Sequence, residues 1–222
     1  MTGRPQRHLV FATSGAPTLL ATIAARPTSP RLTYAIRGGA VVLLTMLTAA
    51  AAQVSVPLPF TPVPFTMQPM VVLLGGAALG SRLGMLSQWL YLALGVAGLP
   101  VFAVSPMLPL GAARLLGPTG GYLISYPFAA WVTGRLAERG FDRRYVTTVL
   151  AMGCGLALVF GIGVLWLTVL SLPARGPLGA VRTALWAGLY PFLLLDILKL
   201  FLAAGILPAI WRLTGLGRAR ET

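Results

Sequence analysis

Apolar runs separated by short segments rich in arginine, proline or glycine fill the chain from residue 38 to residue 212. A helix needs about 20 apolar residues to cross the hydrocarbon core of a bilayer, which is roughly 30 Å thick. The pattern therefore predicts an all-α membrane protein. Its six transmembrane helices are expected near residues 38–54, 69–80, 84–99, 119–136, 145–171 and 183–212.

Three connections between the predicted helices are long or irregular. The first holds the proline series VPLPFTPVPFTMQP, through which no helix continues because proline lacks the backbone N–H and clashes with the preceding turn. The second, near residues 100–118, and the third, LPARGPLGAVR, are also rich in proline and glycine. Irregular backbone near membrane depth is tolerated where protein buries it or where it lines a cavity. The pattern suits a lidded pocket, and it suits plain exposed connections equally well.

The arginines orient this arrangement. Ten lie on the side of the predicted termini: Arg31, Arg37, Arg82, Arg135, Arg139, Arg143, Arg144, Arg212, Arg218 and Arg220. Three lie on the opposite side: Arg114, Arg175 and Arg182. Because short loops rich in Lys and Arg stay in the cytoplasm, we expect a multi-pass protein of the cell membrane. Both termini are then cytoplasmic, and the three irregular connections face outward.

The two ends of the chain lie outside the predicted bundle. Residues 1–30 contain no acid, and their apolar runs are too short for a secretory signal. We expect a disordered tail or a misassigned start there. Residues 31–214 are the expected six-helix domain, and residues 215–222 are a basic C-terminal tail.

Composition supports the membrane class. Hydrophobic residues make up 57% and charged residues 9% of the chain, whereas a soluble domain carries about 25% charged residues. The net charge of +13 could indicate nucleic-acid binding, but that requires basic residues clustered on a soluble face. One cysteine, Cys154, and one histidine, His8, exclude an internal disulfide and argue against a metal centre. We expect no cofactor and no nucleic-acid partner.

One oppositely charged pair interrupts the last apolar run, in LLLDILKLFL. Asp196 and Lys199, the only lysine of the chain, share a helix face because residues three apart lie about 60° apart around the axis. An Asp or Lys at the centre of a membrane helix costs about 2.5–3.5 kcal/mol on insertion scales. The pair could neutralise itself, Lys199 could reach an interface while Asp196 caps a neighbouring helix, or both could bind a polar solute.

Other residues could complete a solute site. Tyr122 follows Gly120 and Gly121 at a predicted helix start, where glycine lets backbone amides approach a ligand and the helix end favours anions. The remaining candidates are Gln88, Tyr190 and, as a carboxylate clamp, Arg114. Taken singly, an interfacial tyrosine is more often an anchor at the membrane surface than a ligand contact.

Three segments together resemble the BioY family. They are VPLPFTPVPFTMQPMVVLLGGAALGSRLGMLSQWLYLALGVAGLPVFA, LLGPTGGYLISYPFAAWVTGRLAER and YPFLLLDILKL, and the similarity extends over residues 37–212. These proteins are the biotin-specific, substrate-binding (S) subunits of energy-coupling-factor (ECF) transporters. The resemblance implies a six-helix fold and an outward-facing biotin pocket closed by the first two of these connections, the proline series and the loop near residues 100–118. It implies a transporter and not an enzyme.

The resemblance also implies partners and site residues. Family members work with a transmembrane coupling (T) subunit and a pair of ATP-binding cassette ATPases, although some transport biotin alone. The family's Asp-x-x-Lys pocket pair corresponds to Asp196 and Lys199, while Leu195 departs from the glycine that many relatives have there. The coupling subunit docks against small residues of the first helix. This chain offers Thr45 with Ala49 and Thr48 with Ala52 at that spacing.

Biotin would account for the charged pair. An ionised Asp196 can accept hydrogen bonds from the ureido N–H groups, Tyr122 can cover the bicycle, and either Lys199 or Arg114 can bind the carboxylate. The chain has no phosphate-binding Gly-x-x-x-x-Gly-Lys loop, so we expect partner proteins to hydrolyse ATP. One alternative is a solo or proton-coupled transporter in which Asp196 titrates. Another is an intramembrane enzyme, which would lack a metal set or a third catalytic partner.

Overall fold

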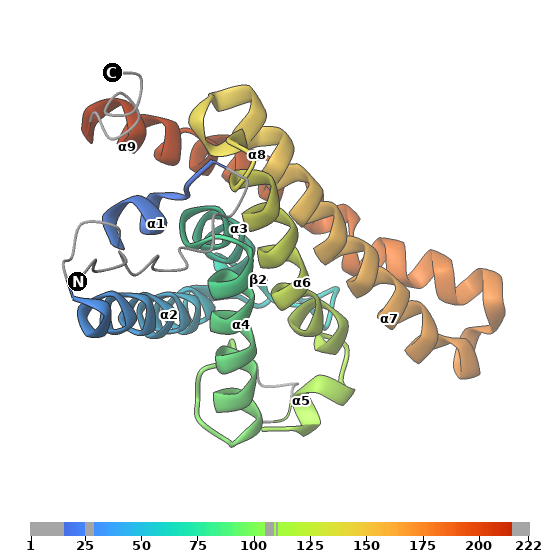
Figure 1. Ribbon diagram of the computed structural model, residues 1–222. Coiled ribbons are helices and arrows are strands. Elements are labelled where there is room, and N and C mark those ends of the chain that lie inside the picture. Colours follow the sequence, from blue (N-terminus) through green and yellow to red (C-terminus); the bar gives the residue numbers. More distant parts are fainter. Residues whose placement is uncertain (1–15, 25–28, 105–108, 110, 215–222) are drawn as a thin grey trace, which may run out of the picture.

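The computed structural model describes residues 16–24, 29–104, 109 and 111–214 (Figure 1). Within these ranges the chain is mostly helical, as predicted, and a single short hairpin is added. The helices are α1 (Leu19–Ala24), α2 (Pro30–Gln53), α3 (Gln68–Leu79), α4 (Ser81–Val96), α5 (Ala113–Leu116), α6 (Gly120–Ala137), α7 (Tyr145–Gly188), α8 (Tyr190–Ala204) and α9 (Ile206–Thr214). A 3-10 helix, η1 (Phe141–Arg143), precedes α7, and strands β1 (Ser55–Val56) and β2 (Phe65–Thr66) form the antiparallel hairpin.

Helix α6 lies in the middle of the bundle and packs against α3, α4 and α7 (Figure 1). Its residues Ala129 and Ala130 are fully buried. A Cβ atom added at Gly76 of α3 would lie 2.8 Å from the Cα of Ala130, and one at Gly84 of α4 would lie 2.9 Å from the Cα of Gly76. Small side chains therefore let the three helices approach closely, as is common where membrane helices pack.

The connection predicted between the fifth and sixth spans is wrong, because those residues are helical. Helix α7 is two helices that meet at Gly176, whose φ of 65° and ψ of 174° break the helical geometry. Glycine adopts this φ without the steric cost that a Cβ atom would bring. Pro177 then begins the second helix, where the missing N–H costs nothing. The result is a helical hairpin that turns back toward α8 (Figure 1).

Three helical segments of the described chain are long and apolar enough to cross a membrane: Pro30–Gln53, Tyr145–Gly188 and Tyr190–Thr214. The last includes α8 and α9, which meet at Gly205. Helix Gln68–Leu79 is apolar but short. The six-span count and the cytoplasmic orientation of both termini stay predictions.

One end of the bundle is formed by α1, η1 and α9, and we call it the α9 end (Figure 1). Residues 16–24 belong to the segment predicted as a tail, yet Thr18 and Leu20 are buried there and α1 packs against α2 and α3. The indole Nε1 of Trp211 donates a hydrogen bond to Oδ2 of Asp142 at 2.7 Å. Residues 1–15 and 215–222 lie outside the described residues.

Candidate ligand-binding site

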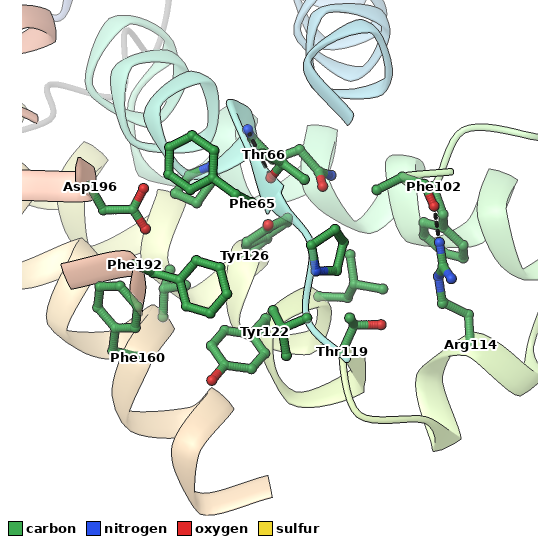
Figure 2. Close-up of a pocket in the computed structure, with 17 residues that line it drawn as sticks. Phe65, Thr66, Phe102, Arg114, Thr119, Tyr122, Tyr126, Phe160, Phe192 and Asp196 are labelled. Carbon is green, nitrogen blue, oxygen red and sulfur yellow. Dashed lines mark hydrogen bonds between the residues drawn. The ribbon is translucent and has the colours of Figure 1, made fainter. Parts of the chain in front are cut away.

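A cavity lies between helices α5, α6, α7 and α8 and the segment of residues 54–67, which we call loop 1. About 60 Å³ of it is open to the centres of water molecules, which is room for a few waters. Most of the lining is apolar. The aromatic residues of the lining are Phe65, Phe102, Tyr122, Tyr126, Phe160 and Phe192, and the polar ones are Thr66, Gln68, Arg114, Thr119 and Asp196 (Figure 2).

Loop 1 is one wall of this cavity. Its prolines prevent a helix, and β1 and β2 pair to form a short ribbon. Two hydrogen bonds fasten the loop to distant helices. The hydroxyl of Thr61 donates to the carbonyl of Ala187 at 2.5 Å, and Nζ of Lys199 donates to the carbonyl of Thr66 at 2.7 Å.

Asp196 places a carboxylate at the cavity from the middle of α8. The residue is buried, and its carboxylate forms an ion pair with Lys199 three residues later, on the same helix face as the spacing predicts. Asp196 lines the main cavity, whereas Lys199 does not. Both also line a second, smaller cavity of about 10 Å³. The pair is therefore neither turned toward lipid nor sealed by packing, because voids adjoin it.

The aromatic walls are fixed in place by packing and by hydrogen bonds. Phe65 of β2 stacks on Phe192 of α8, with ring centroids 6.5 Å apart and an interplanar angle of 8°. The hydroxyl of Tyr122 donates to the carbonyl of Gly188 at 2.8 Å. A side chain at Gly163 or Gly188 would collide with Tyr122, so these glycines make room for its ring. Flat rings held in this way suit an apolar ring system.

Arg114 of α5 is 2% exposed, which is unusual for an arginine. Its Nη2 donates to the carbonyl of Ala103, while Nη1 is buried and has no hydrogen-bond partner among the described residues. Burial lowers the pKa of the guanidinium below its ordinary value, but arginine stays charged at neutral pH. A buried donor without a partner is costly, so this group is suited to an anionic ligand.

The charged groups of the cavity lie far apart. Figure 2 shows Asp196 at one end and Arg114 at the other, with Phe65, Phe192 and Tyr122 between them. The site thus combines an acceptor of hydrogen bonds, an aromatic middle and a cationic donor. It matches an elongated ligand that has N–H donors at one end and an anion at the other.

Comparison with known proteins identifies the family. The sequence profile of the BioY family matches residues 29–215. The chain belongs to the BioY family. It is 40% identical to the "Probable biotin transporter BioY" of Pyrococcus horikoshii over 159 residues, which are 72% of this chain and 86% of that protein. It is 38% identical to the "Biotin transporter BioY" of Thermotoga maritima over 163 residues, which are 73% of this chain and 88% of that protein.

The fold has a solved counterpart. The crystal structure at 2.1 Å of the S-component for biotin from an ECF-type ABC transporter matches with a TM-score of 0.68. It is 24% identical in sequence, and the match covers 84% of this chain and 95% of that one. The prediction of an S-component fold is confirmed. The prediction that the chain is not an enzyme is confirmed too, since its BioY relatives are transporters by name.

The structure brings some of the predicted site residues together and leaves others apart. Asp196, Tyr122 and Arg114 line the main cavity. Lys199 forms an ion pair with Asp196 but does not line this cavity. The other four predicted residues do not line it; they are Gln88, Tyr190, Gly120 and Gly121.

Those four residues have other surroundings. Nε2 of Gln88 donates to the hydroxyl oxygens of Thr48 and Ser87, both at 3.2 Å, within the α2–α4 contact. Tyr190 is half exposed and packs edge-on against the ring of Trp186. Gly120 and Gly121 face other parts of the protein: a Cβ atom at Gly120 would strike the carbonyl of Leu115, and one at Gly121 would strike the side chain of Trp166.

Several lining residues were not predicted as site residues. Phe65, Thr66 and Gln68 come from loop 1 and the start of α3, Thr119 precedes α6, and Phe160 lies on α7. The proline series indicated that loop 1 has a special shape, but not which of its side chains face inward. Phe160 carries no sequence signal, because an aromatic residue in an apolar helix is ordinary.

The face of α2 suggested for docking is turned toward the interior. Thr45, Thr48 and Ala52 are buried, and Ala49 is half-buried against the core. The hydroxyl of Thr45 donates to the carbonyl of Ser87 at 2.9 Å. These positions pack α2 onto α4, so they are not free to receive a partner in this conformation.

The described residues offer no cluster of three or more His, Cys, Asp or Glu side chains that could hold a metal ion. Cys154 is exposed on α7, and the acids lie on separate elements.

Proposed function

We propose that the chain binds biotin in the main cavity and serves as the substrate-specific subunit of an ATP-driven ECF transporter for biotin. The observation that carries this proposal is the separation of Asp196 and Arg114 at opposite ends of a cavity with aromatic walls (Figure 2). Family membership and relatives named as biotin transporters support the choice of ligand.

The chemical groups of biotin occur in the same order along the molecule as their proposed partners occur along the cavity. Its ureido N–H groups would donate to the carboxylate of Asp196, a charge-assisted bond that is strong away from water. The bicycle with its thioether would lie among Phe65, Phe192 and Tyr122. The carboxylate of the valerate tail would accept from Nη1 of Arg114, which has no hydrogen-bond partner within the described part of the chain. Arg114 is thus favoured over Lys199 as the carboxylate's partner, since Lys199 does not line the cavity.

The cavity has to widen to take the whole vitamin. Its 60 Å³ holds a few water molecules, and biotin has a bicycle and a tail. Loop 1 is the wall that can move with the least disruption, because its ribbon is short and its links to α7 and α8 are individual hydrogen bonds. Movement of loop 1 would give biotin access to the site.

The membrane topology that we propose has six spans, with both termini in the cytoplasm. The three long apolar segments and the apolar helix α3 support membrane insertion, and the ten arginines on the terminal side support the orientation. Loop 1 and the cavity then face outward, and the α9 end faces the cytoplasm.

Transport requires partners in this proposal. The structural counterpart is the S-component of an ECF-type ABC transporter, and this sequence has no phosphate-binding loop of its own. A transmembrane coupling subunit and ATP-binding cassette ATPases would supply the energy. Neither ATP nor any other cofactor would bind this chain.

A ligand-dependent melting experiment tests the binding function. Purified protein in detergent should melt at a higher temperature with biotin, because a ligand that binds only the folded state stabilises it. Thiamine and riboflavin serve as matched controls and should leave the melting temperature unchanged. An equal shift with all three vitamins, or no shift with biotin, would contradict the assignment.

Uptake into proteoliposomes tests the energy source. We expect biotin uptake only when the coupling subunit and the ATPases are present with ATP. Uptake by the chain alone, driven by a proton gradient, would instead support the solo transporter in which Asp196 titrates.

A further inference from the structure

We propose that the helical hairpin of α7 and the start of α8 bind an anionic phospholipid along one face of the protein. This face, which we call the hairpin stripe, consists of five exposed residues: Arg175, Arg182, Trp186, Tyr190 and Leu194. The inference requires that the chain lies in a membrane and does not depend on biotin, so it goes beyond the function proposed above.

Two arginines converge near the tip of the hairpin. A Cβ atom added at Gly179 would lie 3.2 Å from the Cβ of Arg175, so Arg175 lies directly beside Gly179. Arg182 follows Gly179 by three residues, and side chains three apart share one face of a helix. Both guanidinium groups can therefore reach a single anion.

No acidic residue of the sequence lies near this pair of arginines along the chain. The four acidic residues are Glu138, Asp142, Asp196 and Glu221. Residues 143–195 therefore contain none, and the ion pairs found within the described residues join Arg135 to Glu138 and Lys199 to Asp196. Two arginines without a carboxylate partner form a surface complementary to a phosphate group, which guanidinium binds well.

The first half of α7 is long enough to bring these arginines to the surface of a bilayer. From Tyr145 to Gly176 it measures about 45 Å at 1.5 Å per residue, whereas the hydrocarbon core is roughly 30 Å thick. Residues 172–178 are all exposed, and the tip of the hairpin lies at the edge of the molecule, away from α2 and α3 (Figure 1). The tip is therefore expected at the depth of the lipid headgroups.

Beyond the arginines the stripe becomes first aromatic and then aliphatic. Trp186 follows Arg182 by four residues and packs edge-on against Tyr190, with ring centroids 5.3 Å apart. Leu194, which is 77% exposed, follows Tyr190 by another four residues on α8. Trp and Tyr favour the membrane interface. The stripe thus presents cations, aromatic rings and an aliphatic side chain in the order of the phosphate, the glycerol esters and the acyl chains of a phospholipid.

Helix α6 offers a contrast. Trp131 is exposed there and Arg135 follows it by four residues, so an arginine and a tryptophan again share a face. Nη1 of Arg135, however, pairs with the carboxylate of Glu138 at 3.1 Å. A guanidinium whose charge is balanced by a carboxylate attracts an anionic lipid less, so the hairpin stripe is expected to select the headgroup and the face of Arg135 is not.

Quenching of Trp186 fluorescence by brominated lipids tests the proposal in bilayers. The full chain is reconstituted into phosphatidylcholine vesicles that contain a fixed share of either brominated phosphatidylglycerol or brominated phosphatidylcholine. The emission of wild type minus that of Trp186→Phe isolates Trp186. Each arginine near an anionic lipid strengthens association about fivefold, so phosphatidylglycerol should be enriched beside Trp186 about five- to thirtyfold over phosphatidylcholine. Equal quenching by the two lipids would overturn the proposal.

Variants of the arginines locate the selectivity. The double variant Arg175→Gln, Arg182→Gln should lose the enrichment, whereas Arg175→Lys, Arg182→Lys retains both charges and should keep most of it. Arg135→Gln is the matched control and should behave like wild type. Enrichment that survives the glutamine pair, or that is lost equally in Arg135→Gln, would overturn the assignment. If the double variant does not fold, Arg182→Gln alone is judged by an expected loss of about fivefold.

Two further arms distinguish a lipid from other occupants of the stripe. Glycerol 3-phosphate carries the phosphate without acyl chains and, at millimolar concentration, should leave the enrichment unchanged; displacement of the lipid would show a site for a soluble anion and overturn the proposal. Dilution of the protein in lipid should leave the quenching of Trp186 unchanged. A rise with both lipids on dilution would show that a second copy of the chain covers the stripe, which would also overturn it.

Discussion

Two buried carboxylates, Asp142 at the α9 end and Asp196 at the cavity, are alike in burial and differ in their surroundings. Each is almost inaccessible, at 1% and 7% exposure, and each has a basic residue close by in sequence. Asp142 accepts from the indole of Trp211 at 2.7 Å, and the guanidinium of Arg143 lies 4.5 Å from the centre of the Trp211 ring. Asp196 pairs with Lys199 but opens onto a cavity.

The difference offers a criterion for telling a structural acid from the binding acid that we propose at Asp196. Asp142 accepts a hydrogen bond from the indole of Trp211 and lines neither of the two cavities described, so its carboxylate links η1 to α9. Asp196 has an ion-pair partner in Lys199 and also lines the main cavity, where a donor from a ligand could reach it. Burial and a nearby cation are common to both acids; the adjoining void is what distinguishes them.

The largest expected effect comes from Asp196→Asn. Removing the negative charge weakens the hydrogen bonds to the ureido group and leaves Lys199 without its counter-charge. We expect biotin affinity to fall at least about tenfold, the size of one charge-assisted hydrogen bond, as measured by isothermal titration calorimetry. Asp142→Asn is the matched control and should bind like wild type. Equal affinity in both variants would remove the contrast between the two acids.

The sequence could predict the acid at the cavity but not its surroundings. A charged residue in an apolar helix stands out because of its insertion cost, and the three-residue spacing predicts that Asp196 and Lys199 share a face. Gln88 was also a candidate, as a polar residue inside a predicted span, but it bonds across helices to Thr48. A polar residue in a membrane helix therefore indicates that its side chain has a hydrogen-bonding partner. It does not show whether that partner is a ligand or a neighbouring helix.

The tertiary contacts of loop 1 and the helical hairpin could not be predicted from local patterns. The bond of Lys199 to Thr66 joins residues 133 positions apart, and no periodicity encodes it. The hairpin at Gly176 was predicted as a loop because prolines flank it. Proline is compatible with the first turn of a helix, and one glycine with positive φ is sufficient to reverse the chain there.

A second expected effect concerns stability at the α9 end. Trp211→Phe removes the indole N–H and leaves Oδ2 of Asp142 without its donor, which costs about 1–3 kcal/mol when the acceptor is buried. The melting temperature of the purified protein should fall by several degrees, with biotin affinity unchanged. A loss of affinity without a loss of stability would show that the α9 end communicates with the cavity.

The pH dependence of stability sharpens the comparison further. Burial raises the pKa of Asp142 above its ordinary value, although the hydrogen bond from Trp211 and the charge of Arg143 oppose the shift. An acid with a raised pKa in the folded state favours folding when it is protonated, and this contribution is lost as pH rises from its unfolded pKa to its folded pKa. The melting temperature of wild type relative to Asp142→Asn should therefore decline as pH rises from about 4. A difference that is flat or that grows with pH would contradict this sign.

The smallest expected effect separates two contacts of a single carboxylate, that of Glu138. Its Oε1 accepts from the backbone N–H and the hydroxyl of Ser81, at 2.8 and 2.7 Å, where α4 begins. Its Oε2 pairs with Arg135, whose side chain is 57% exposed. Exposed ion pairs contribute about 0–1 kcal/mol, whereas a lost cap of a helix start costs about 0.5–2 kcal/mol.

Arg135→Ala should therefore shift the melting temperature by about a degree or less, and Glu138→Ala should lower it more. The two variants remove the same ion pair, so any excess loss in Glu138→Ala measures the bonds to Ser81. If both variants melt alike, the cap of α4 adds nothing, and the stability of this end resides in the contact of Asp142 with Trp211. Neither substitution should alter biotin affinity, because neither residue lines the cavity.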